Sequence, residues 1–132
     1  MATQYTIDAL RGVVFTTFSG AITFEEVVAH AVALRGDPIF HPAFTELLDL
    51  REVTYTNLTF QELERLSHTI DPFSRTAQRA IVASSDLMYE TSRMYQKARD
   101  AGENVRVFRT IDEAREWLDG ADSPADLNRR SA

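Results

Sequence analysis

Hydrophobic positions along the chain change their period several times, and each change predicts an element of secondary structure. Period two is typical of a strand, and a period near 3.6 is typical of a helix. Two short strands are predicted first, at Thr3–Ile7 and Val13–Phe18. The link between them, DALRG, ends in Gly12, a residue suited to a left-handed turn position. We therefore expect these strands to form an antiparallel hairpin.

Four later segments carry helical periodicity. Three of them begin with a capping box, in which two side chains satisfy backbone N–H groups at the helix start. The boxes pair Thr23 with Glu26, Thr59 with Glu62 and Thr110 with Glu113. The other helix begins at Ser85 or Asp86, stops at Gly102, and is predicted to pack through Leu87, Met94, Ala98 and Ala101.

Glycine and proline mark the predicted ends of the capped helices. Gly36 suits a left-handed C-terminal cap, Pro72 ends the second helix, and Gly120 ends the last one. Residues 121–132 have no apolar face to bury, so we expect a disordered tail there. The predicted domain is residues 1–120.

Three further strands are predicted at residues 43–50, 79–84 and 105–109. Strands that alternate with helices imply parallel pairing through right-handed crossovers. The segment 79–84 is apolar on both faces, as an interior parallel strand should be, whereas the first and fifth strands alternate and suit the two edges. The pattern predicts an α/β fold with a five-stranded mixed sheet, its first strand antiparallel and the rest parallel, and four helices.

Composition narrows the class of partner. The 132 residues fit one domain, and the net charge of −6 argues against nucleic acid or an anionic membrane as the main partner. The chain has no cysteine, which removes disulfides and thiolate chemistry and suits the cytoplasm. We expect no signal peptide, and no stretch approaches the roughly 20 apolar residues that span a bilayer.

Several stretches together resemble one known family. They are FSGAITFEEV, LLDLREVTYTNLTFQEL, RAIVASSDLMYETSRMYQKA and VRVFRTIDEAREWL. In order and spacing, over residues 3–120, they are similar to the SpoIIAA-like (STAS/SEC14-like) family of small bacterial domains. The resemblance implies a right-handed β-α superhelix with strands in consecutive order. It also implies a domain that binds partners or apolar ligands rather than an enzyme.

The loop after the third strand lacks the switch of the anti-sigma-factor antagonists that this family includes. In those proteins the resemblance points to an Asp-Ser-Ser-Gly motif whose first serine is phosphorylated. Here Asn57, Leu58, Thr59 and Phe60 occupy the four positions. Leucine accepts no phosphate, Thr59 is explained as a helix cap, and we expect Thr54 and Thr56 to be solvated loop residues.

Candidate binding residues cluster at the predicted carboxyl ends of strands. Asp49 orients a ligand, pairs with Arg51, or bonds to backbone N–H groups, and these alternatives stay open. The helix starts at Thr59 and Ser85 expose N–H groups to which an anion could bind. The full set of candidates is Asp49, Arg51, Tyr55, Thr56, Asn57, Thr59, Ser84, Ser85, Met88, Tyr89 and Tyr95.

The sequence predicts a non-enzymatic, STAS-like protein-interaction or regulatory module. We expect a homodimer, formed through an exposed sheet face or through the helix carrying Met88, Tyr89 and Tyr95. The alternative is a carrier of a small apolar ligand or lipid, in which the aromatic residues line a cleft. No catalytic residue, cofactor or metal site is predicted, because His30, His41 and His68 lack metal-ligand spacing and suit surface or boundary positions.

Overall fold

The five strands lie side by side in the order in which they occur along the chain. The computed structural model describes residues 2–100 and 104–122. The strands are β1 (Ala2–Asp8), β2 (Val13–Ile22), β3 (Thr45–Thr56), β4 (Arg79–Val82) and β5 (Val105–Phe108). β1 pairs antiparallel with β2, and every later pair is parallel. The predicted sheet, including β1 and β5 as its edges, is confirmed.

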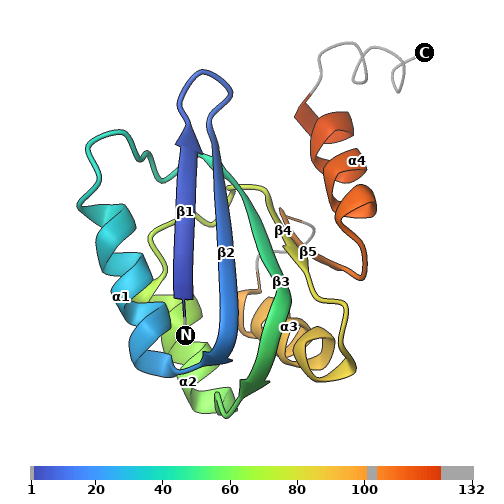
Figure 1. Cartoon of the computed structure of the whole chain (residues 1–132). Helices are drawn as coiled ribbons and strands as arrows, with labels where there is room; N and C mark the ends of the chain where they lie inside the picture. Colours follow the sequence, from blue (N-terminus) through green and yellow to red (C-terminus); the bar gives the residue numbers. More distant parts are fainter. Residues whose placement is uncertain (1, 101–103, 123–132) are drawn as a thin grey trace.

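The helices cover both faces of this sheet. They are α1 (Phe24–Arg35), α2 (Phe60–Arg65) with its π-helical continuation η1 (Leu66–Ile70), α3 (Asp86–Arg99) and α4 (Ile111–Asp122). α1, α2 and α3 pack on one face, which we call the cavity face, and α4 packs on the other, the α4 face. Figure 1 shows α4 set apart from the other three helices.

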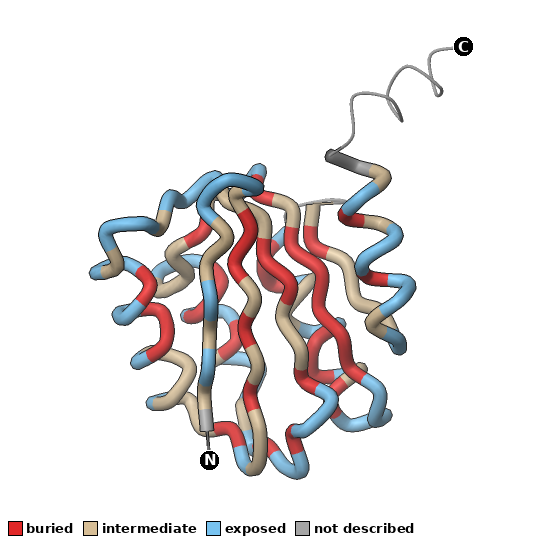
Figure 2. Tube along the Cα trace, turned by 45° about the horizontal axis from the view of Figure 1, so that its top comes forward, coloured by how far each residue is buried: buried red, intermediate tan, exposed pale blue. Residues whose placement is uncertain are grey.

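Alternation along the strands builds a core on each face. In β2, Thr16 and Phe18 are buried toward the cavity face, whereas Phe15 packs with Leu47 and α4. All four residues of β4 are buried, which is the expected property of an interior parallel strand. Figure 2 shows the buried positions running along the central strands, with exposed positions along β1 at the rim.

β2 and β3 are longer than the pattern predicts. They pair in parallel beyond the end of β4, as far as Ile22 opposite Thr56, with two register shifts on the way. Thr54 and Thr56 therefore belong to a strand, and the prediction that they are solvated loop residues is wrong for the buried Thr56. The sequence carries the signal, because Val53, Thr54 and Tyr55 are residue types that favour strands.

The predicted turn and cap residues have mixed outcomes. Gly12 has a φ of 66°, as predicted, and Thr59 forms the reciprocal capping box with Glu62. Gly36 has a φ of −83°, so the left-handed cap predicted there is wrong: the turn closes in right-handed geometry through N–H bonds to Val32 and Leu34 carbonyls. α4 continues through Gly120 to Asp122, and the rest of the predicted tail lies outside the described residues.

The buried face of α3 differs from the predicted one. Ala98 is buried as predicted, but Leu87 and Met94 are 48% and 37% exposed, while Met88, Ser92 and Arg99 are buried. The prediction failed because α3 buries polar side chains that find partners: the Thr91 hydroxyl, for example, donates to the Leu87 carbonyl at 2.8 Å. Ala101 and Gly102, named in the prediction, lie outside the described residues.

Candidate functional site

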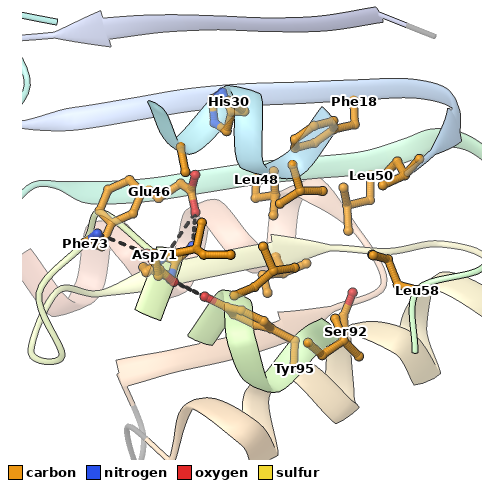
Figure 3. Close-up of a pocket in the computed structure, with 18 of the residues that line it drawn as sticks. Phe18, His30, Glu46, Leu48, Leu50, Leu58, Asp71, Phe73, Ser92 and Tyr95 are labelled. Carbon is orange, nitrogen blue, oxygen red and sulfur yellow. Dashed lines mark hydrogen bonds and ion pairs between the residues drawn. The ribbon is translucent and has the colours of Figure 1, made fainter. Parts of the chain in front are cut away.

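A cavity of about 110 Å³ lies between the sheet and the three helices of the cavity face. Its walls are mostly apolar and come from β2, β3, β4 and from each of the three helices. Apolar lining residues are Phe18, Ile22, Val27, Ala31, Leu34, Leu48, Leu50, Leu58, Leu63, Leu66, Ile70, Pro72, Phe73, Ile81 and Met88. Figure 3 shows Phe18 and His30 on one side and Ser92 and Tyr95 of α3 on the opposite side.

One end of the cavity is polar, and the other is lined by hydrocarbon. Figure 3 shows Glu46 and Asp71 at the first end and Leu58 at the second. The Leu58 side chain forms part of the cavity wall. The loop between β3 and α2 therefore contributes to the cavity.

A buried ion-pair cluster forms the polar end. Arg79 Nη2 and Nε lie 2.8 Å and 3.1 Å from Glu46 Oε1. Arg79 also contacts Asp71, which accepts the Tyr95 hydroxyl and lies 3.3 Å from Arg99 Nη1. These five residues, named the ion-pair cluster below, connect β3, β4, α3 and the segment that follows η1. Two carboxylates face two guanidinium groups, so their charges balance.

The cluster holds Asp71 and Tyr95 in fixed protonation states near neutral pH. Burial alone would raise the pKa of Asp71, but Arg79, Arg99 and the Tyr95 hydroxyl outweigh it and keep that pKa below 3.8. Burial raises the pKa of Tyr95, and the neighbouring Asp71 adds to this effect against the opposing charge of Arg79. Neither group therefore titrates near neutral pH, where a general acid or base would need to.

His30 is a buried member of the cavity wall. Its Nε2 lies 3.3 Å from Thr16 Oγ1, and its ring stands edge-on to the rings of Tyr5 and Phe18. Burial lowers the pKa of His30 below 6.5, with Glu46 opposing the shift. Its Nδ1 is buried without a hydrogen-bond partner among the described residues. The prediction of a surface or boundary position for His30 is wrong, since two aromatic side chains from β1 and β2 cover it.

The predicted site residues separate into three groups. Met88 and Tyr95 line the cavity, and Thr56, buried nearby, donates to the Ile22 carbonyl. Because both Met88 and Tyr95 point inward, the helix face that they were expected to offer to a second copy is not a surface. The carboxyl edge of the parallel strands carries the second group: Tyr55, Asn57, Thr59, Ser84, Ser85 and Tyr89.

The third group is the pair Asp49 and Arg51 on the α4 face. Asp49 alternates with the cavity-lining Leu48 and Leu50, so it points away from the cavity. Arg51 binds both of its carboxylate oxygens, at 3.0 Å and 2.9 Å, and the Arg51 backbone N–H also donates to it. Burial alone would raise the pKa of Asp49, but these bonds hold it below 3.8. Two of the three alternatives for Asp49 are therefore confirmed: it pairs with Arg51, and it accepts a hydrogen bond from a backbone N–H group.

Reasoning from the sequence missed most of the polar end of the cavity. Glu46, Asp71, Arg79 and Arg99 belong to four separate segments, and only the fold brings them together. One signal was present: Glu46 and Arg79 lie within otherwise apolar strand segments, where a charge is buried only with a partner. Among the described residues, no group of three His, Asp or Glu side chains is placed to hold a metal ion.

Comparison with a solved structure supports the fold. No family model and no curated protein matches the chain. The crystal structure of an uncharacterized DUF3478-family protein with a SpoIIAA-like fold, from Shewanella loihica PV-4, is 20% identical over 88% of this chain and 93% of that one, with a TM-score of 0.54. The unphosphorylated anti-sigma factor antagonist SpoIIAA is 14% identical over 90% of this chain and 99% of that one, with a TM-score of 0.49.

The likeness to the Shewanella loihica protein concerns the fold and not the activity. The strand order, the antiparallel first strand and the placement of the helices confirm the expected resemblance at the level of the fold. In the part of the chain that the structure describes, no helix is long and apolar enough to cross a membrane. The chain has the SpoIIAA-like fold.

Proposed function

We propose that this protein is a non-enzymatic, STAS-like binding module that holds a small apolar ligand in its internal cavity. The observation that carries the proposal is the cavity itself, an apolar space with one polar end. A well-formed apolar pocket with a few convergent polar groups is the usual form of a small-molecule site. Three helices and three strands contribute to its walls, so the site is built by the fold and not by one loop.

The volume of the cavity restricts the ligand. A dry engineered cavity of roughly 150 Å³ binds benzene, so about 110 Å³ suits a molecule of this order after slight adjustment of the walls. A lipid with long acyl chains needs far more, since pockets for larger ligands measure roughly 300–1,000 Å³. We therefore favour a small apolar molecule over the lipid that the SEC14 branch of the resemblance suggests.

The protonation states in the cavity support a binding role over catalysis. Asp71 stays ionised and Tyr95 stays protonated across the neutral range, and both are committed to the ion-pair cluster. The His30 ring is held between Tyr5 and Phe18, and its Nε2 contacts the Thr16 hydroxyl. The absence of cysteine and the family resemblance favour a cytoplasmic protein of a bacterium, and this location is part of the proposal.

A toluene titration of the full chain, followed by ¹H–¹⁵N NMR, tests the cavity. We expect saturable shifts centred on residues of the cavity wall. Ala31→Leu, which fills the cavity from α1, should weaken toluene binding at least about tenfold, whereas Ala33→Leu on the exposed side of the same helix should leave it unchanged. Ser92→Leu, from the opposite wall, replaces the first variant if overpacking prevents folding. Equal effects of the two alanine variants, or no saturable shifts in the wild type, contradict the proposal.

A second candidate is a protein-interaction module that acts through the carboxyl edge. Tyr55, Phe60 and Leu87 are 56%, 49% and 48% exposed, and they stand at the end of β3 and the starts of α2 and α3. Exposed apolar side chains gathered at one edge favour a partner. The first partner to test is a second copy of the chain, as the sequence predicts.

Analytical ultracentrifugation over a wide concentration range tests this second candidate. The wild type should show a monomer–dimer equilibrium that Phe60→Ser combined with Leu87→Ser shifts to monomer. Val32→Ser, an equally exposed apolar position on α1, serves as the matched control and should leave the equilibrium unchanged. A wild type that stays monomeric at every concentration removes the homodimer from this candidate.

A further inference from the structure

The carboxylate of Glu46 uses only one of its two oxygens within the ion-pair cluster. Arg79 donates twice to Oε1, at 3.1 Å and 2.8 Å. No hydrogen bond among the described residues reaches Oε2, although the side chain is only 2% exposed and lines the cavity. A carboxylate oxygen accepts hydrogen bonds strongly, so Oε2 is available to accept one from a bound molecule. The polar end of the cavity therefore presents an acceptor that lacks a donor.

A second polar atom near this end also lacks a partner. His30 lines the same cavity, and its Nδ1 is buried without a hydrogen bond among the described residues. Glu46 and His30 both line this cavity, and Figure 3 shows both side chains in its wall. One carboxylate oxygen from β3 and one buried imidazole nitrogen from α1 thus have no hydrogen-bond donor or acceptor among the described residues, beside an apolar space.

Charge balance decides which chemical class of ligand these groups accept. Glu46 and Asp71 carry two negative charges, and Arg79 and Arg99 carry two positive charges. A ligand carboxylate or ammonium group would bring an unpaired charge into this buried, balanced cluster, which costs much free energy. A neutral hydroxyl group adds no charge and supplies the donor that Oε2 lacks.

Resting on the proposed function, we infer that the cavity selects small uncharged alcohols or phenols, with the ligand hydroxyl donating to Glu46 Oε2 and the hydrocarbon part lying among Leu48, Ile81 and Met88. The hydroxyl of the ligand lies at the polar end of the cavity, and its hydrocarbon part fills the space toward Leu58. No covalent step is involved. The selectivity comes from one charge-assisted hydrogen bond and from the exclusion of ionised groups.

The sign of the preference distinguishes this site from a purely hydrocarbon cavity. In a cavity without acceptors, phenol binds worse than toluene, because its hydroxyl loses hydrogen bonds to water and gains none. If the phenol hydroxyl donates a hydrogen bond to Glu46 Oε2, phenol should bind about tenfold more tightly than toluene. Two compounds of nearly the same size thus report on a single atom.

The experiment compares four probes on the full chain at pH 7 by NMR titration: phenol, toluene, benzoate and benzylamine, the last two ionised at this pH. We expect phenol to bind most tightly, toluene about tenfold more weakly, and the two ions at least about a hundredfold more weakly than phenol. The carboxyl ¹³C resonance of Glu46 should move with phenol and stay in place with toluene.

A pair of variants on β3 adds a control. Glu46→Gln should reduce the phenol preference over toluene to less than about threefold, and Glu52→Gln on the exposed part of the same strand should preserve the preference. Because the first variant disturbs a buried ion pair, the wild-type probe series decides the matter if it fails to fold. Toluene binding as tightly as phenol, or benzoate binding equally well, overturns the inference alone. No binding by any probe overturns the proposed function as well.

Discussion

Arg79 Nη2 lies 2.8 Å from Glu46 Oε1, and the two residues are direct register partners on the neighbouring strands β4 and β3. Their side chains are 7% and 2% exposed. Removing one partner of such a buried pair leaves an uncompensated charge, which is far more costly than the pair is favourable. The pair therefore fixes the polar end of the cavity and makes it sensitive to substitution.

Replacing Arg79 by methionine should lower the free energy of unfolding by about 3–5 kcal/mol, because Glu46 and Asp71 are left buried without their shared cation. Urea denaturation of the full chain measures the change. Arg109→Met is the matched control, since Arg109 is 42% exposed in its ion pair with Asp86, and a pair of this kind contributes at most about 1 kcal/mol. A loss below about 1 kcal/mol for Arg79→Met would show that the cluster is not a structural requirement.

Asp71 should make stability depend on pH at the acid end. Its pKa in the folded protein lies below 3.8 because Arg79, Arg99 and Tyr95 favour the carboxylate. The contribution is fully present above the ordinary pKa and is lost as the pH falls through the lower folded value. Unfolding measured from pH 7 to pH 2 should therefore show a gap between wild type and Asp71→Asn that closes below about pH 4. A gap of constant size over this range contradicts the assignment.

His30 should add a second pH dependence in a different window. Burial lowers its folded pKa below 6.5, so the unfolded chain takes up a proton first and stability falls as the pH drops below 6.5. His30→Gln should flatten the stability curve between pH 6.5 and the folded pKa, which an NMR titration of the imidazole resonances measures directly. A folded pKa at or above 6.5 would show that the ring is not buried between Tyr5 and Phe18.

Two glycines should respond oppositely to alanine. Gly12 has a φ of 66°, and a Cβ there would meet Phe44 at 3.3 Å, so Gly12→Ala should destabilise the protein by about 1 kcal/mol or more. Gly36 has a φ of −83° and a nearest contact of 3.6 Å, so Gly36→Ala should be neutral or stabilise by up to about 1 kcal/mol. Thermal unfolding of both variants checks the pair. If both variants were destabilised equally, the result would indicate that Gly36 has a left-handed conformation, as the sequence predicted.

The sheet could be predicted from the sequence because the burial of each strand determines its pattern of apolar and polar residues. Residues 79–82 are apolar on both sides apart from Arg79, and this placed β4 in the interior. Alternation in β1 and β5 placed them at the edges, which the strand order confirms. These features depend on local residue pattern, and so a single sequence suffices to reveal them.

The polar end of the cavity could not be predicted in the same way. His30 falls at the border of the apolar face of its helix. Its burial depends on Tyr5 and Phe18, which belong to the strands β1 and β2. Arg99 is the clearest case. A charged residue late in a helix suggests solvent, yet this guanidinium is 3% exposed and donates to the Ser67 and Phe73 carbonyls at 2.8 Å. Contacts between segments that are distant in the sequence determine such burial. The local pattern of apolar and polar residues does not reveal these contacts.

Intermolecular NOEs between toluene and the full chain test the central claim most directly, because they locate the bound molecule atom by atom. The account predicts NOEs from the toluene ring to side-chain protons of Leu48, Ile81 and Met88, which line the cavity from the sheet and from α3. NOEs confined to exposed apolar side chains such as Leu10 and Val32, or no NOEs at saturating toluene, would contradict it.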